Sequence, residues 1–511
     1  MSEQLALLPG YLTAHLQLAL VALLLGIAIS VPLGVLVARV RWLEQPVLGF
    51  ASVIQTIPSL ALLAVMVPLL AAANLPSIGY LPAFIGLVLY SVLPILRNTV
   101  TGLATVDPAL IEAARGVGMT SRQRLARVEL PLAMPVIIAG IRTATIWTVG
   151  IATLSTPVGA TSLGNYIFSG LQTRNQSAVM VGCIAAAVLA LTLDGLVRLV
   201  AVGWERRHRG LLGVALGALA LLYLYTGVTL GRELLQAKHE RIVVGAKTFT
   251  EQYILSEILA GQMMHETGIP TEVTQSLGST VAFDALRSGE IDVYVDYSGT
   301  IWATLMQREM GPTNRSDVLA GVEQFLLDRH GIVVVGALGF ENAYALAMRR
   351  ERAERLRIRR ISDLVLHAPT LSIGGDYEFF GRAEWRAVRE TYGLRFAAQR
   401  SMDSSLMYQA AAQGNVDVIS AFSTDGRIAA LDLLILEDDR GAIPPYDAVI
   451  LASARLQRRH PEASDALRRL AGKIDSHTMQ RMNLAVDQDS QSPGAVASAF
   501  LDALWRSDHR I

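Results

Sequence analysis

The chain has 511 residues, of which 52% are hydrophobic and 17% are charged, and this length suffices for two or three domains. Its 44 Lys and Arg residues balance its 44 Asp and Glu residues, so no nucleic-acid-binding surface is predicted. The only cysteine, Cys183, cannot form a disulfide within the chain. Residues 1–230 are strongly apolar, residues 231–241 read as a short linker, and residues 242–511 have the composition of a water-soluble domain.

Six apolar segments in the first half are each long enough to cross a bilayer, which takes about 20 residues. They are 12–38, 47–73, 78–100, 132–154, 177–202 and 210–230. A large buried helical core is the alternative, but uncharged runs of this length are rare in water-soluble folds. We therefore expect an N-terminal all-α membrane domain with about six helices.

Basic residues fall in alternate loops between these segments, which predicts the orientation of the domain. The loops that follow the first, third and fifth segments contain Arg39, Arg41, Arg97, Arg115, Arg122, Arg124, Arg127, Arg198, Arg206, Arg207 and Arg209. The other loops carry only Arg174. The basic loops are therefore expected in the cytoplasm, and the water-soluble half on the opposite side. Arg142 lies inside the fourth segment, where it either reaches toward the cytoplasmic interface or lines a translocation path.

The cytoplasmic segment 110–131 reads LIEAARGVGMTSRQRLARVELP. Leu110–Gly116 has helical propensity, Gly116 and Gly118 interrupt the helix, and Thr120 is suited to cap a second helix that we expect to end at Pro131. Taken alone, the segment could be a solvated amphipathic loop. Its small residues and glycines would also let another protein approach closely.

The spacing in this segment resembles the EAA loop of bacterial ABC importer permeases. The residues that carry the resemblance are Glu112, Ala113, Ala114, Gly118 and the run Val128-Glu129-Leu130-Pro131, in which only Val128 departs from the usual Ile. The resemblance implies that Glu112, Ala113, Ala114 and Gly118 dock onto a separate ATPase subunit. The chain itself has no G-x-x-x-x-G-K-[ST] phosphate loop.

Strands and helices alternate in residues 242–511, which predicts an α/β fold with mostly parallel sheets, and the length suffices for two lobes. Segments 242–247, 291–297 and 416–420 read as strands, whereas 251–266 and 465–474 read as helices. No motif for catalysis or metal binding is present, so we expect neither an enzyme nor a metal site.

Several chemically distinctive residues stand at strand ends, where α/β proteins bind ligands. Lys247, one of only three lysines in the chain, directly follows an apolar strand. Aromatic residues at similar positions are Tyr294, Tyr297, Tyr344, Phe422 and Tyr446. Such side chains can equally be part of the core, and the sequence alone does not separate the two interpretations.

This half of the chain resembles the substrate-binding proteins of glycine betaine, choline and carnitine ABC importers. The resemblance covers nearly all of 242–511 and is carried by the runs VVGAKTFTEQYIL, IDVYVDYSGT, GFENAYALAM, LMYQAAAQGNVDVISAFSTDGRI and ILEDDRGAIPPYDAVI. It implies two lobes that close on a quaternary ammonium group. The implied aromatic cage is Tyr297, Tyr344, Phe422 and Tyr446, and the implied carboxylate-binding residues are Lys247, Thr300 and Arg382. Phe422 departs from the usual Tyr, which keeps the ring but loses a hydroxyl.

The two resemblances together imply a permease fused to the binding protein of an ABC importer in the inner membrane. The expected substrate is glycine betaine, with choline, carnitine, proline betaine and ergothioneine as alternatives, and the two cationic residues favour a betaine over choline. The expected partners are a second copy of the chain and a separate ATPase, which uses the ATP, so no cofactor is expected here. A ligand-gated channel would need a selectivity filter, and a membrane-anchored sensor would need a cytoplasmic domain, and neither is visible.

Overall fold

The computed structural model describes residues 2–73, 75–173, 175–236, 241–308, 314–377, 379–489 and 491–508. The chain divides into two compact units. The helical unit comprises Met1–Phe168 and Ser177–His239, and the α/β unit comprises Ser169–Gln176 and Glu240–Ile511. Arg174 and the linker positions 237–240 lie outside the described residues, and the preceding positions of the expected linker are helical as far as Gln236.

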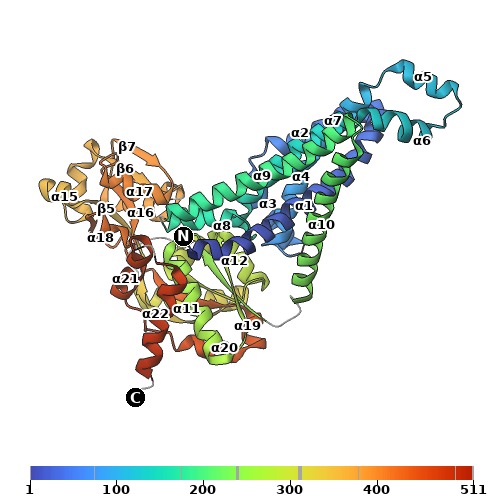
Figure 1. Ribbon diagram of the computed structural model, residues 1–511. Helices are drawn as coiled ribbons and strands as arrows, with labels where there is room; N and C mark the ends of the chain where they lie inside the picture. The colour runs from blue at the N-terminus through green and yellow to red at the C-terminus, as the bar shows by residue number, and fades with distance from the viewer. Residues whose placement is uncertain are drawn as a thin grey trace. The chain divides into compact units, whose positions relative to one another are not determined.

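Helices make up the helical unit, and most of them are long and apolar, which confirms the expected membrane domain. They are α1 (Ser2–Arg39), α2 (Glu44–Thr56), α3 (Ser59–Ala72), α4 (Tyr80–Ala104), α5 (Pro108–Gly116), α6 (Ser121–Arg124), α7 (Leu130–Ala152), α8 (Gly164–Gln172), α9 (Gln176–Glu205) and α10 (Arg209–Gln236). Among the described residues, five stretches can cross a membrane by length and composition, or six if α2 and α3 count as one. Figure 1 shows α5 and α6 at the end of this unit opposite the N-terminus.

The second expected span, 47–73, is not one continuous helix. Helices α2 and α3 are bent by 99° at the break between them. Ile57 there is extended, with φ −73° and ψ 126°, because the ring of Pro58 disfavours helical backbone in the residue before it.

Helix α4 packs against both α1 and α7. Glycines allow the close approach on each side. A Cβ atom at Gly34 of α1 would lie 2.7 Å from the Cβ of Thr99, and one at Gly140 of α7 would lie 2.7 Å from the carbonyl oxygen of Pro94. Small residues at helix contacts are the usual means of tight packing in membranes, where apolar burial does not drive association.

The charged segment begins as expected, with a short helix, a glycine turn and a capped second helix. Helix α5 ends at Gly116, and Gly118 then takes φ +78°, a conformation that glycine adopts without strain. Thr120 caps α6 through a capping box with Gln123, in which each side chain accepts from the other residue's backbone N–H.

The prediction that the second helix ends at Pro131 is wrong. A π-helical turn, η2 (Leu125–Glu129), joins α6 directly to α7, and Pro131 lies in the first turn of α7. The backbone N–H of Leu130 donates to the carbonyl of Leu125, five residues back. A proline ring clashes with the carbonyl four residues before it in a regular helix, and the wider turn relieves that clash.

Glu129 in this turn is paired with two arginines. Its carboxylate accepts from Arg39, at the end of α1, and from Arg124, at the end of α6, both at 2.6 Å. The side chains of Glu129 and Arg124 are each only 9% exposed. The charged segment is thereby tied to the end of the first membrane helix.

Arg142 is also paired. It donates to both carboxylate oxygens of Asp194 on α9, at 2.8 and 3.0 Å. The sequence suggested an interfacial or path-lining position for Arg142, but it did not indicate this partner. A bidentate pair lets an ionic side chain remain among membrane helices at a lower cost.

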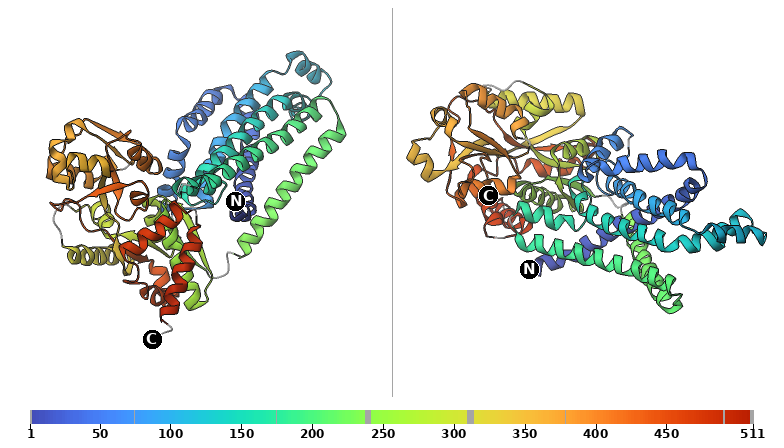
Figure 2. Two further views of the ribbon diagram at one scale, coloured as in Figure 1. Left: turned by 60° about the vertical axis from the view of Figure 1, so that its left-hand side comes forward. Right: turned by 90° about the horizontal axis from the view of Figure 1, so that it is seen from above.

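Two five-stranded sheets form the α/β unit, one in each of two lobes (Figure 2). Sheet A has the order β2 (Thr271–Leu277), β1 (Ile242–Lys247), β3 (Val293–Tyr297), β10 (Asp447–Ala452) and β4 (Val333–Glu341). Sheet B has the order β7 (Ala398–Ser401), β6 (Ser372–Gly375), β8 (Val418–Phe422), β5 (Tyr344–Arg349) and β9 (Leu433–Leu436). The lobe that contains sheet A is called lobe A, and the lobe that contains sheet B is called lobe B.

The α/β class and the two lobes are confirmed, but the sheets are mixed rather than mostly parallel. In sheet A, β1 pairs in parallel with β2 and β3, whereas β10 is antiparallel to β3 and β4. Sheet B repeats this arrangement around β6 and β5. The antiparallel pairs arise because the chain crosses between lobes after β4 and again before β10, so each lobe receives strands from both directions.

Helices cover both sheets. They are α11 (Thr250–Thr267), α12 (Ser279–Ser288), α13 (Ser298–Thr300), α14 (Arg315–His330), α15 (Arg350–Leu356), α16 (Ala383–Tyr392), α17 (Ser404–Ala412), α18 (Arg427–Ala430), α19 (Ala454–Arg459), α20 (Pro461–Arg468), α21 (Ser476–Asp487) and α22 (Pro493–Asp508). The predicted helix 465–474 extends beyond the observed one. Helix α20 ends at Arg468, and Gly472 takes φ +69°. Helix α11 packs against β1, β2 and β3, and its first turn lies at the end of β1.

Candidate functional site

A cavity of about 290 Å³ lies in the α/β unit, lined by residues of both lobes. Lobe A contributes the ends of β1 and β3 and the first turn of α11, and lobe B contributes the start of β5 and the end of β8. The structure brings all seven residues expected from the sequence to its lining: Lys247, Tyr297, Thr300, Tyr344, Arg382, Phe422 and Tyr446. Long-range strand pairing assembles them, since they span almost 200 positions of the chain.

Aromatic rings form one continuous group in this lining. The Tyr344 ring centroid lies 4.9 Å from that of Phe422 and 6.1 Å from that of Tyr446. Phe249, which the sequence analysis did not single out, lies 6.2 Å from both Tyr297 and Phe422 and links the rings of the two lobes. The five rings of this group form a surface suited to a compact cation without hydrogen-bond donors.

Arg382 and Tyr446 share an acidic partner. Glu384 accepts a hydrogen bond from the Tyr446 hydroxyl and lies 3.3 Å from Nε of Arg382, and the Glu384 side chain is 1% exposed. The guanidinium of Arg382 lies 5.2 Å from the ring centroid of Tyr344. Burial, followed by the charge of Glu384, raises the pKa of Tyr446 well above its usual value, so this hydroxyl stays protonated.

Lys247 is paired as well. Its Nζ lies 2.5 Å from Oδ1 of Asp296, and both side chains are 4% exposed. Asp296 also accepts from the Tyr294 hydroxyl at 2.5 Å and from the backbone N–H of Tyr297 at 2.7 Å. The positive charge of Lys247 is therefore largely neutralised within lobe A, although its ammonium group has further N–H donors.

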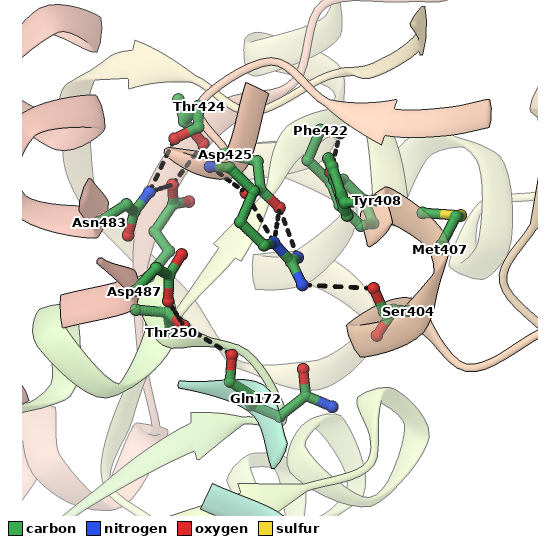
Figure 3. Close-up of polar contacts among 12 residues, drawn as sticks. Gln172, Thr250, Ser404, Met407, Tyr408, Phe422, Thr424, Asp425, Asn483 and Asp487 are labelled. Carbon is green, nitrogen blue, oxygen red and sulfur yellow. Dashed lines mark hydrogen bonds and ion pairs between the residues drawn. The ribbon is translucent and has the colours of Figure 1, made fainter. Parts of the chain in front are cut away.

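Glu251, in the first turn of α11, accepts four hydrogen bonds. One carboxylate oxygen accepts from the Tyr297 hydroxyl at 2.5 Å and from Asn342 at 3.0 Å. The other accepts from the hydroxyl of Thr424 and from Asn483 at 3.2 Å, and Figure 3 labels these two donors. Burial raises the pKa of Glu251, while these four hydrogen bonds oppose that increase.

A second buried pair supports the lobe B side of the cage. Arg427 donates to both oxygens of Asp425 and to the carbonyl of Ser404, and its guanidinium lies 4.0 Å from the ring centroid of Tyr408. The Tyr408 hydroxyl accepts from the backbone N–H of Phe422. This bond holds the backbone of Phe422, whose ring lacks the hydroxyl that a tyrosine would bring.

The cavity carries more acidic than basic groups. Of the described residues that line it, five are acidic and three are basic, namely Glu251, Asp376, Asp403, Asp425 and Asp487 against Lys247, Arg382 and Arg427. No group of three or more potential metal ligands occurs among the described residues. The site can therefore hold a small positively charged head group through ring faces and nearby carboxylates.

The residues of the charged segment 110–131 form a separate candidate site in the helical unit. Glu112, Ala113 and Gly118 are exposed, whereas Ala114 is buried. Leu110 and Val117 add exposed apolar surface, at 46% and 73% exposure. Exposed apolar and acidic side chains around a glycine turn are suited to contact another protein.

Known proteins match both units. The substrate-binding domain of ABC-type glycine betaine transport systems matches residues 240–503, and the inner membrane component of binding-protein-dependent transport systems matches residues 30–206. The ergothioneine transport permease/ergothioneine binding protein EgtU of Helicobacter pylori (strain G27) is 31% identical over 91% of this chain and 84% of its own length.

Two further relatives each match one half of the chain. The glycine betaine/carnitine/choline transport system permease protein OpuCB of Bacillus subtilis (strain 168) is 44% identical over 35% of this chain and 80% of its own length. The carnitine transport binding protein OpuCC of Listeria monocytogenes is 31% identical over 51% of this chain and 86% of its own length. The two units thus resemble separate transport proteins that the Helicobacter relative combines.

Proposed function

Since this chain belongs to the ABC importer family, with an inner membrane component joined to a glycine betaine-type substrate-binding domain, we propose that it captures and imports a small quaternary ammonium compound. The α/β unit binds the compound outside the cytoplasm, and the helical unit provides the path across the membrane. The observation that carries this proposal is the group of five rings around a cavity whose lining has more acidic than basic residues.

A methylated ammonium group has no N–H to donate, so a protein holds it by shape and electrostatic potential. Each desolvated contact between a cation and an aromatic face contributes about 2 kcal/mol. The ring faces of Tyr297, Tyr344, Phe422 and Tyr446, joined by Phe249, suit this role. A cavity built for an anion would instead have unpaired basic groups, whereas Lys247 and Arg382 both have acidic partners.

We propose glycine betaine as the substrate, bound with its carboxylate near Lys247, Thr300 and Arg382. The two cationic residues were expected to favour a betaine, which has a carboxylate, over choline, which has none. Because both cations have acidic partners, that preference now rests on the remaining N–H donors of Lys247 and on the hydroxyl of Thr300. Ergothioneine is the second candidate, because a relative named for its transport aligns with both units. It is also a betaine and offers the same two groups to the cage.

The transport cycle requires an ATPase, for which the chain has no phosphate loop. We propose that a separate ATPase subunit docks at Glu112, Ala113, Ala114 and Gly118, and that two copies of this chain form the path. The substrate-loaded α/β unit would deliver its ligand to the helical unit, and closure of the ATPase would move the docking segment.

Calorimetry on residues 241–508 tests the substrate. Related binding proteins correspond to this half alone, so the unit is expected to fold by itself. Titration with glycine betaine, choline, carnitine and ergothioneine should give a saturable signal for at least one betaine. Tyr297→Ala should weaken that binding more than tenfold, since about 2 kcal/mol is lost with the ring. Tight binding of choline with none of any betaine would contradict the proposed substrate class.

A further inference from the structure

Glu251 has an unusual environment for a carboxyl group. It is buried, and among the described residues no ion pair includes it. A carboxylate without a cationic partner is costly inside a protein, and such groups are normally paired or protonated. Glu251 has no such ion pair within the described part of the chain, and it lines the cavity.

The four hydrogen-bond partners of Glu251 are arranged for the ionised form. Asn342 and Asn483 each direct an amide nitrogen, which can only donate, at one of the two carboxylate oxygens. The hydroxyls of Tyr297 and Thr424 complete the pattern. Four donors around two oxygens stabilise a negative charge but do not cancel it.

The basic residues near Glu251 and its four hydrogen-bond donors form ion pairs with other acids. Lys247 at the end of β1 is paired with Asp296 on β3, and Arg427 at the start of α18 is paired with Asp425. Asp487, one turn beyond Asn483 on α21, accepts from Thr250 and adds a further acid. Among the described residues, no ion pair joins Glu251 to Lys247 or Arg427, and hydrogen bonds stabilise its charge.

Tyr297 connects this charge to the cage. Its hydroxyl donates to Glu251, and its ring is one of the five that face the cavity. A phenol that donates to a carboxylate carries more electron density in its ring, which strengthens the attraction for a cation on the ring face. Thr424 belongs to lobe B, so the same carboxylate also holds that lobe against lobe A.

We propose that Glu251 is a specificity-determining residue that acts through Tyr297 and makes the site select a cationic head group over a neutral group of the same shape. The inference rests on the proposed function, because it assumes a quaternary ammonium ligand in the cage. It goes beyond the cage itself, whose rings would also hold an uncharged tert-butyl group by apolar contact.

The test compares two ligands that differ only in charge at one atom. Glycine betaine and tert-butylacetate have the same shape and the same carboxylate, but the trimethylammonium nitrogen of the first is a carbon in the second. Ligand-observed NMR on the full chain in detergent gives both affinities. Glu251→Gln should reduce the preference for glycine betaine by about tenfold or more, because a full charge near the cage is lost while the size is kept.

Thr424→Val is the matched control, because it removes one hydrogen bond from the same carboxylate and leaves the charge. It should weaken both ligands by a similar factor and keep their ratio. Equal losses for both ligands in Glu251→Gln would mean a structural role only and would overturn the inference. Tyr297→Phe is the second variant if Glu251→Gln fails to fold, and an unchanged ratio there would count against the inference as well.

Affinities of the wild-type protein distinguish a failure of the proposed function from a failure of the inference about Glu251 alone. If it binds glycine betaine and choline no better than their tert-butyl analogues, both the proposed function and the inference fail. If it prefers the ammonium compounds and Glu251→Gln retains that preference, the inference alone fails.

Discussion

Replacement of Lys247 by methionine distinguishes a structural from a ligand-binding role for this residue. The Nζ atom of Lys247 lies 2.5 Å from Asp296, and the two side chains are only 4% exposed. Removal of one partner of a buried pair costs about 3–5 kcal/mol, because the other charge stays buried without compensation. The hydrogen bonds of Asp296 to Tyr294 and to the backbone of Tyr297 retain part of its stabilisation, so we expect the lower end, about 3 kcal/mol.

A loss of this size is readily measured. In a domain of this length, 1 kcal/mol corresponds to about 2–4 °C in melting temperature, so Lys247→Met should lower the melting temperature of residues 241–508 by about 6–12 °C. Lys247→Met combined with Asp296→Asn removes both charges and should recover most of this loss. Thermal unfolding followed by circular dichroism, without ligand, is the assay. An unchanged melting temperature for Lys247→Met, together with weaker ligand binding, would refute the structural role and leave ligand binding as the role of Lys247.

Three further predictions concern both units. Glu112→Lys should abolish uptake by the assembled transporter and leave ligand binding by the α/β unit unchanged, because it reverses the charge on the proposed docking surface; normal uptake in proteoliposomes would exclude that role. Arg142→Gln should lower the thermal stability of the detergent-solubilised chain, and the addition of Asp194→Asn should recover it, since the single change leaves one charge unpaired among membrane helices. Burial raises the pKa of Glu251, and a bound cation favours its charged form, so ligand binding near that pKa should release a proton and tighten as the pH rises. Calorimetry in buffers of different ionisation enthalpy measures this release, and the Glu251→Gln variant should show neither effect.

The sequence predicts the cage better than its surroundings. Aromatic residues at strand ends are recognisable from the pattern alone, and the family resemblance assigns them a ligand. The Lys247–Asp296 pair depends on the register of β1 and β3, in which Val244 lies beside Val293, so the two charged residues, each three positions further on, are neighbours. That register is a long-range property that no local pattern reveals.

Glu251 and the bend in the second span were missed for different reasons. A glutamate in the first turn of a helix is common, since it favours the positive end of the helix dipole, so its burial at a cavity left no signal. The bend did leave a signal, because Pro58 disfavours helical backbone at Ile57. The prediction of one continuous span over 47–73 followed hydropathy instead, since the segments on both sides of Pro58 are equally apolar.

The π-helical turn at 125–129 determines which residues of the charged segment face each other. In a regular α-helix, five residues advance the chain by about 500°, which would place Arg124 and Glu129 about 140° apart around the axis. A π-turn brings residues i and i+5 one above the other, and only then can these two side chains meet at 2.6 Å. The Arg124–Glu129 ion pair therefore depends on the geometry of this wide turn. Any movement of α6 that straightened this turn would therefore separate Glu129 from Arg124 and leave Glu129 paired with Arg39 alone.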